Sequence, residues 1–394
     1  MATIIIFILI LGVLIFVHEM GHFLAAVRNG IKADEFGFGF PPRIFGLFKD
    51  EKSGKHKFVL GNREVKSKNT VYSLNWIPLG GFVKIKGENG EGASESDSFS
   101  AQPAWTRIKV LAAGVAMNFF LAWILLSIVL MIGAPQAIDD NADAPNAKVQ
   151  ISQIVPGAPA EKMGLKIGDE ILAARLSAGG AAGAERENWS EIKTAGRMQT
   201  LTAKSKGRKI ILKIKRGQET LELKGTPRIE YPEGQGPLGI SLARTAIVSY
   251  PWYESIWRGL LAVFDLTLAI FIALGGIIRN LFLGEGMAMD IAGPVGIAVM
   301  TKQAAALGLV YVLQFAAILS VNLGIINGLP FPALDGGRIL FILIEKIKGS
   351  RVSQKVEQAL HTAGFFLLIA LMVVVTFRDF IRFEIVDKIK GLFG

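Results

Sequence analysis

The sequence predicts a multi-pass α-helical membrane protein with about four transmembrane helices, a β-hairpin that dips toward the membrane and one inserted soluble domain. Of the 394 residues, 51% are hydrophobic, and the mean hydropathy is positive. Four apolar stretches are candidates for crossing a hydrocarbon core of roughly 30 Å, which takes about 20 helical residues. Between them, residues 144–243 have the composition of a soluble domain with short strands.

The net charge of +10 and the absence of cysteine restrict the possible partners and chemistry. Basic residues beside apolar spans usually meet anionic lipid headgroups, and no nucleic-acid-binding motif is visible. The expected partner is therefore the lipid bilayer and not nucleic acid. Without cysteine there are no disulfides, thiolate ligands or cysteine nucleophiles, so nitrogen and oxygen atoms must hold any metal.

The first apolar stretch, Thr3 to Val27, is long enough to span the membrane, yet it contains ionisable side chains. The alternative is a signal peptide, but no Lys or Arg precedes its apolar core. Ionisable groups at membrane depth are costly, and by default they indicate a functional site that faces the protein interior or a water-filled cavity.

Those ionisable groups form the motif His18-Glu19-Met20-Gly21-His22. On a helix, residues i and i+4 share a face, so both imidazoles can bind one metal ion while Glu19 lies next to it. This is the arrangement of a zinc hydrolase, in which the carboxylate takes a proton from the attacking water. The chain has four histidines, and His56 and His361 remain unassigned.

Residues 34–42 and the lysine-rich stretch 49–68 are expected to form a polar loop. Two β-prone runs follow, Thr70 to Trp76 and Phe82 to Lys86, and residues 77–81 between them predict a hairpin. Its strand edge could capture an extended peptide by strand addition, or the hairpin could merely pack on the helices.

Residues 88–103 form a Gly/Ser/Glu-rich linker, and Ile108 to Ile132 is the second predicted span. Gly114 and Asn118 lie on one face of that helix, and small residues at such spacing indicate close helix packing. Asn118 is interpreted as a helix-to-helix hydrogen bond, with a substrate contact as the alternative.

In the soluble segment, residues 155–172 resemble a PDZ domain, in which proline opens a short helix and a Gly-Asp pair turns into a strand. The order of elements is similar to the permuted bacterial type. That resemblance places the peptide-carboxylate loop at Leu238, Gly239 and Ile240. The competing interpretation is a domain that acts only as a steric filter.

Residues 250–283 are apolar but carry Arg258, Asp265 and Arg279, which are separated by multiples of seven and fall on one helical face. This pattern favours an amphipathic helix along the membrane surface. Residues 308–328 and 361–377 are the remaining predicted spans.

The motif Asn327-Gly-Leu-Pro-Phe-Pro-Ala-Leu-Asp335-Gly-Gly interrupts the helix where the third span ends. Asp335 is the only acid between Asp290 and Glu345, so it is the candidate for the missing oxygen ligand of a His₂Asp site. The alternative is an aspartate that caps the next helix. For the two ligand-bearing helices to run parallel, an odd number of crossings must separate them, so residues 250–283 should not cross and four crossings result.

Together these pieces resemble the bacterial site-2 protease family, the intramembrane zinc metalloproteases that include the regulator of sigma-E protease. The resemblance extends over nearly the whole chain. Its motifs are HEMGH at 18–22, YSLNWIPLGGFVKIKGE at 72–88, LAAGVAMNFFLA at 111–122, IAGPVGIA at 291–298 and NGLPFPALDGG at 327–337. The sequence departs from the family at Val115, where proline is usual, and in having one PDZ domain where some relatives have two.

The resemblance implies that His18, His22 and Asp335 bind Zn²⁺, that Glu19 is the general base, and that Asn327 holds the substrate. It also implies that the hairpin is a membrane-reentrant β-loop; the substrate contacts are then Trp76, Gly80, Gly81 and Phe82. The expected location is the bacterial inner membrane, with the PDZ domain on the extracytoplasmic side.

The sequence thus predicts an endopeptidase that cleaves transmembrane segments of membrane proteins, such as anti-sigma factors or remnant signal peptides. The expected parts are residues 1–143, a membrane half; 144–245, the PDZ domain; and 246–394, a second membrane half. A non-catalytic PDZ receptor is the main alternative, and a metal transporter the second. The intact set of ligands and base argues against both.

Overall fold

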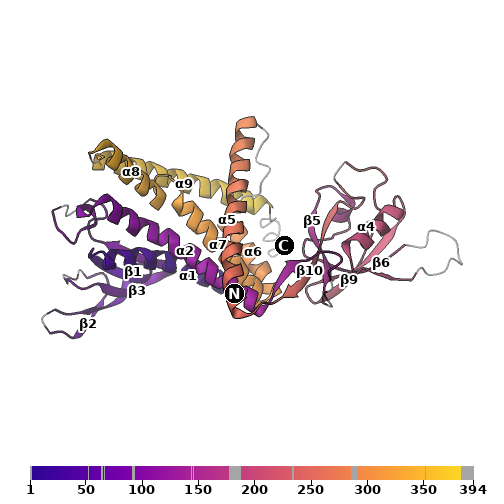
Figure 1. Cartoon of the computed structure of the whole chain (residues 1–394), viewed down its shortest axis with the longest axis horizontal. Coiled ribbons are helices and arrows are strands. Elements are labelled where there is room, and N and C mark those ends of the chain that lie inside the picture. The colour runs from indigo at the N-terminus through magenta and orange to yellow at the C-terminus, as the bar shows by residue number, and fades with distance from the viewer. Residues whose placement is uncertain are drawn as a thin grey trace, which may run out of the picture. The chain divides into compact units, whose positions relative to one another are not determined.

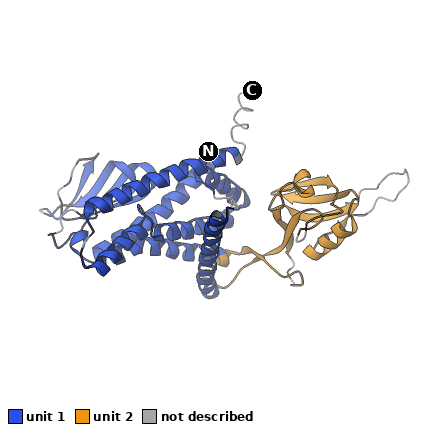
Figure 2. Ribbon diagram, turned by 90° about the horizontal axis from the view of Figure 1, so that it is seen from above, with its two compact units in different colours: residues 1–129, 252–394 blue, residues 130–251 orange. Residues whose placement is uncertain are grey.

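The computed structural model describes residues 2–51, 53–63, 65, 67–90, 94–142, 144, 146–176, 188–232, 235–284, 292–350 and 352–382. The chain divides into two compact units (Figure 2). The first unit combines Met1–Val129 with Trp252–Gly394, and the second consists of Leu130–Pro251.

Long helices dominate the first unit (Figure 1). They are α1 Ala2–Arg28, α2 Ala104–Ile132, α5 Trp252–Leu283, α6 Pro294–Leu307, α7 Leu309–Gly328, α8 Asp335–Lys348 and α9 Gln354–Arg382. The four stretches predicted to span the membrane all form helices, α1, α2, α7 and α9. Within the described residues, five helices are long and apolar enough to cross a membrane, because α5 also qualifies.

Helix α7 is packed by several others, as expected of a helix that is apolar all round. Ala317 and Val321 of α7 form a core with Ala122 of α2 and Val263 of α5, while Ala316 packs with residues of α1. α5 therefore lies against α2 and α7 through one face. Its three predicted charges, Arg258, Asp265 and Arg279, are all exposed.

A small sheet lies against α1 (Figure 1). It contains β1 Ala33–Lys49, β2 His56–Leu60 and β3 Val71–Ile85, in the order β2-β1-β3. The prediction of a loop at residues 34–42 is therefore wrong, because these residues belong to β1. The aromatic side chains explain the strand, since Phe36 of β1 stacks on Phe23 of α1, with ring centroids 4.6 Å apart.

The prediction that the two runs of β3 pair with each other as a hairpin is wrong. Gly37 of β1 pairs both with Ser73 in the first half of β3 and with Phe82 in the second half. A stretch of β1 thus lies between the two runs that were expected to pair with each other. The sequence hides this arrangement because β1 has glycines where the neighbouring strands come close; a Cβ on Gly37 would lie 2.6 Å from Cε1 of Phe82.

The second unit is built on a seven-stranded sheet in the order β4-β10-β5-β6-β8-β9, with β7 paired to β6. Its elements are β4 Ala134–Ala137, β5 Lys148–Ile154, α3 Pro159–Lys162, β6 Glu170–Leu176, β7 Ser190–Glu191, α4 Ala195–Lys204, β8 Ile210–Arg216, β9 Glu219–Gly225 and β10 Ile240–Val248. The core of this unit is continuous from β5 to β8 and includes Met198 of α4 and Leu238. The short strands predicted for residues 144–243 are confirmed, and they include β5, β6, β8 and β9.

Helix α6 begins inside the segment 291–298 that contributes to the family resemblance; Ile291 itself lies outside the described residues. The fully buried Asp379 of α9 accepts hydrogen bonds from the backbone N–H groups of Gly293 and Gly296, at 2.9 and 2.6 Å. A carboxylate at a helix N-terminus satisfies donors that have no partner within the helix. This contact joins α9 to α6.

Candidate metal centre

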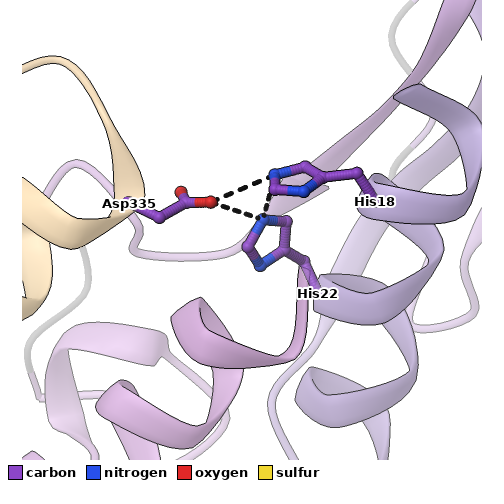
Figure 3. Close-up of side chains that lie close together, drawn as sticks. All are labelled: His18, His22 and Asp335. Atoms are coloured by element: carbon purple, nitrogen blue, oxygen red, sulfur yellow. Dashed lines mark hydrogen bonds and ion pairs between the residues drawn. The ribbon is translucent and has the colours of Figure 1, made fainter. Parts of the chain in front are cut away.

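Helix α1 places His18 and His22 one turn apart, and Asp335 faces them from the start of α8 (Figure 3). The Nε2 atom of His18 lies 3.0 Å from Oδ2 of Asp335, and Nε2 of His22 lies 3.2 Å from the same oxygen. The two Nε2 atoms are 3.1 Å apart. The structure thus brings together three residues from distant parts of the sequence, and both histidines are buried.

The break between α7 and α8 aims Asp335 at α1. Helix α7 ends at Gly328, and Ala333 adopts a left-handed conformation with φ of +79°. Its backbone N–H donates a 2.8 Å hydrogen bond to Nδ1 of His361 on α9. Gly336 and Gly337 permit the tight turn, since a Cβ on either would collide with backbone atoms of residues 328–332. His361, unassigned from the sequence, therefore secures the turn that carries the carboxylate.

The three facing atoms fit a tetrahedral metal ion. Ligand bonds of about 2.0 Å at tetrahedral angles separate two ligand atoms by about 3.3 Å, close to the observed 3.0, 3.1 and 3.2 Å. Two imidazole nitrogens and a carboxylate oxygen are also the donor types that zinc accepts. Oδ2 of Asp335 is buried without a hydrogen-bond partner in the described part of the chain, which a bound cation would remedy.

Helix α2 supports both histidine rings from behind. Nδ1 of His22 donates a 2.9 Å hydrogen bond to the backbone carbonyl of Val110, and Nδ1 of His18 lies 3.1 Å from the amide nitrogen of Asn118. Gly114, one turn from each of them, leaves room for the rings: a Cβ there would lie 2.5 Å from Cε1 of His22. The interhelical contact expected of Asn118 is confirmed.

Glu19 shares a cavity of about 90 Å³ with the three candidate ligands. Its Oε2 accepts a 3.3 Å hydrogen bond from the backbone N–H of Val83 in β3. The backbone of β3 thereby holds the Glu19 carboxylate beside the candidate ligand atoms. The other cavity-lining residues are Val83, Ile85, Glu88, Phe99, Val110 and Leu111.

Two of the predicted substrate residues of β3, Gly80 and Gly81, lie close to helix α1. A Cβ on Gly80 would lie 2.5 Å from Cβ of Ile15, and one on Gly81 would lie 3.0 Å from Cδ2 of Phe16, so this bend packs tightly on α1. Trp76 is exposed. Phe82 lines a second, larger cavity of about 490 Å³ that follows the end of β3 and the turn after it, from residue 82 to residue 89.

The rim of that larger cavity carries charged side chains. Lys86 donates a 2.7 Å hydrogen bond to Asp97 and pairs with Glu95. These hydrogen bonds raise the pKa of Lys86 to about 12. Asn327 occupies the last turn of α7 and is half-buried; among the described residues, it is not one of those that line either cavity.

The predicted peptide loop of the second unit precedes β10. Leu238 is buried in the core of the unit, and Gly239 has a φ of +71°, a conformation that glycine adopts without strain. Ile240 begins β10, which pairs along one edge with β5. Along its other edge, β4 pairs only from Thr245 onward.

Several residues of the metal centre were missed from the sequence. Val83 and Val110 act through backbone atoms, so no side-chain pattern could reveal them. Glu88 was assigned to a linker, although it lines the cavity and pairs with Arg338 of α8. The one available signal for Glu88 was its position directly after the run YSLNWIPLGGFVKIKG, within the family motif.

Comparison with known proteins identifies the family. The model of peptidase family M50 matches residues 6–61 and 56–371, which is most of the chain. The chain belongs to peptidase family M50. The expected resemblance to site-2 proteases is confirmed, and the protein is a zinc metalloprotease of the site-2 type.

The curated relatives of this M50 peptidase match it over almost their entire length. A Clostridium perfringens protein provisionally named as a zinc metalloprotease is 35% identical over 370 residues, 93% of this chain and 95% of the relative. The regulator of sigma-W protease RasP of Bacillus subtilis is 29% identical, covering 96% of this chain and 98% of its own. The zinc metalloprotease RasP of Geobacillus kaustophilus is also 29% identical, covering 97% and 98%.

Proposed function

We propose that this M50 peptidase cleaves transmembrane segments of other membrane proteins within the bilayer. In this proposal His18, His22 and Asp335 are the zinc ligands and Glu19 is the general base. The observation that carries it is the convergence of three candidate ligand atoms, 3.0 to 3.2 Å apart, beside the carboxylate of Glu19. Glu19 and both histidines lie on α1, a helix apolar enough to span a membrane.

Zinc held by the three ligands would supply a Lewis acid for the scissile carbonyl and would acidify the attacking water. Glu19 takes a proton from that water through its carboxylate and delivers it to the leaving amine. The Val83 N–H holds Oε2 of Glu19 in place for this task. Glu19 is not one of the three clustered ligand residues, so its role separates from metal binding.

A helical substrate must unwind before its peptide bonds are accessible, because its backbone groups are already hydrogen-bonded to one another. The second half of β3 can hold such a segment extended, since it follows the 490 Å³ cavity and reaches Glu19 at Val83. Trp76, Gly80, Gly81 and Phe82 belong to this proposed substrate platform, which re-enters the membrane. Asn327 is proposed to hold the substrate near the metal.

The proposed substrates are membrane-anchored anti-sigma factors or remnant signal peptides, and one relative is named a regulator of sigma-W protease. The proposed location is the bacterial inner membrane with four crossings, and α5 is proposed to lie along the membrane surface. The exposure of its three charges on one face supports this position. Residues 144–245 are proposed to form an extracytoplasmic PDZ domain. The stretch of β10 before Arg244, which β4 and Ile138 do not pair, supports peptide binding there.

The test is cleavage of a model single-span substrate by the purified full chain in detergent, with and without a zinc chelator. Glu19→Gln should bind zinc as the parent does and should cut about 10²- to 10⁴-fold more slowly, because it loses the base and keeps the ligands. If neither protein cuts a panel of such substrates while zinc is bound stoichiometrically, the non-catalytic PDZ receptor becomes the better explanation.

A further inference from the structure

The side chain of Asn118, beside His18, has an orientation that the metal centre described so far does not explain. It is fully buried, and its side-chain nitrogen lies 3.1 Å from Nδ1 of His18. In this orientation its Oδ1 is buried without a hydrogen-bond partner among the described residues. A buried polar atom without a partner costs free energy, so its orientation requires an explanation.

The proton on His18 gives that explanation. Nε2 of His18 is the atom that faces Asp335 and His22, so its lone pair is the one available to a metal. A neutral imidazole carries one proton, which must then be on Nδ1. A donor at Nδ1 requires an acceptor, and an amide nitrogen is not one.

Rotating the Asn118 amide by 180° places Oδ1 against Nδ1 of His18. The two orientations of a carboxamide occupy the same volume, and the hydrogen bonds around them decide between them. The rotation pairs the isolated oxygen of Asn118 with the Nδ1 proton of His18, which otherwise faces an amide nitrogen. We infer that Asn118 is a positioning residue that accepts the Nδ1 proton of His18 and fixes the tautomer and angle of this zinc ligand.

The other histidine shows the same arrangement without ambiguity. Nδ1 of His22 lies 2.9 Å from the carbonyl of Val110, which can only accept. Val110, Gly114 and Asn118 are spaced by four, so one face of α2 provides both acceptors and the space between them. Ligating histidines are generally held in this way, and losing the partner costs about 10- to 100-fold in metal affinity.

This inference depends on the proposed zinc ligands, so its test measures zinc affinity rather than peptide cleavage. The full-length protein in detergent is titrated with zinc against a competing chelator, and the absorption of Co²⁺ at the site is recorded. Asn118→Leu has a similar volume and no acceptor, whereas Asn118→Asp keeps an acceptor at Nδ1. Ser320→Ala is the matched control, because it removes a buried 2.7 Å hydrogen bond to the backbone carbonyl of Asn118 and leaves the side chain intact.

We expect Asn118→Leu to bind zinc 10- to 100-fold more weakly and to show a changed Co²⁺ spectrum. Asn118→Asp should bind zinc at least as tightly as the parent, and Ser320→Ala should match the parent. Folded Asn118→Leu with parental zinc affinity would overturn the inference. So would a more than tenfold loss in Asn118→Asp, which decides the question even where Asn118→Leu fails to fold. A parent protein that binds no zinc would instead contradict the proposed ligands.

Discussion

Replacing Gly114 by alanine would press a methyl group into the rings of both candidate histidine ligands. The added Cβ would lie 2.5 Å from Cε1 of His22 and 2.9 Å from Cε1 of His18. Ordinary carbon contacts begin near 3.4 Å, so the His22 ring would have to retreat by roughly 0.9 Å. Ligand distances at a zinc site tolerate about 0.2 Å, so this displacement exceeds the tolerance several-fold.

The surroundings prevent α1 and α2 from absorbing the change cheaply. His22 is tied to Val110 through Nδ1, and the helices already touch at Gly21, where a Cβ would lie 2.7 Å from the carbonyl carbon of Ala113. A misplacement of about 1 Å at a reacting centre costs about 10²-fold in rate. We therefore expect Gly114→Ala to lose about 10²-fold in kcat/KM and to bind zinc more weakly.

The substitution should not act by breaking the helix, since alanine is favoured over glycine within helices by about 1 kcal/mol. Gly275→Ala in α5 is the matched control, because it makes the same helical replacement where no atom of the described residues lies within 4 Å of the new Cβ. Cleavage of the single-span substrate and zinc competition are measured for both variants. Gly114→Ala with parental activity and zinc affinity would refute the reasoning.

Three further predictions address the turn before α8 and the second unit. Ala333→Val should destabilise the protein by about 1 to 2 kcal/mol in thermal unfolding and weaken zinc binding, because a β-branched residue is strained at a φ of +79°. His361→Phe should cost about 1 kcal/mol and also weaken zinc binding, since it leaves the Ala333 N–H without its acceptor; unchanged affinity would contradict this. Arg216→Ala should destabilise the second unit by about 2 kcal/mol because it strips a partner from buried Asp169, while zinc affinity stays parental.

The candidate ligands could be predicted because they are rare side chains in an unsuitable setting. The sequence has two histidines four residues apart within an apolar stretch, and one acid in a long segment without others. Ionisable side chains in such a setting indicate a functional site. The structure brings these three side chains together. Asn118 was also noticed, but its contact with His18 depends on the approach of α1 to α2, which no local pattern encodes.

The small sheet was harder to predict because its pairing is not local. Residues 71–76 and 82–85 are strand-like, and the short link between them favours a simple hairpin. The actual partner of both runs is β1, whose stretch of alternating phenylalanine and glycine was assigned to a loop because of its glycines and prolines. Gly37 fits between two strands because it has no side chain. A glycine in this stretch therefore indicates close approach of neighbouring backbones rather than the end of a strand.

The metal centre thus depends on backbone atoms and missing side chains as much as on its ligands. The Val110 carbonyl fixes one histidine, the Val83 N–H holds Glu19, and Gly114 keeps the space that the rings occupy. Each contribution requires α1 to lie at a fixed distance from α2 and β3. Substitutions that change the spacing of α1 and α2 without replacing a candidate ligand should therefore weaken zinc binding. Gly21→Ala is such a substitution, because its Cβ would lie 2.4 Å from the backbone oxygen of Ala113.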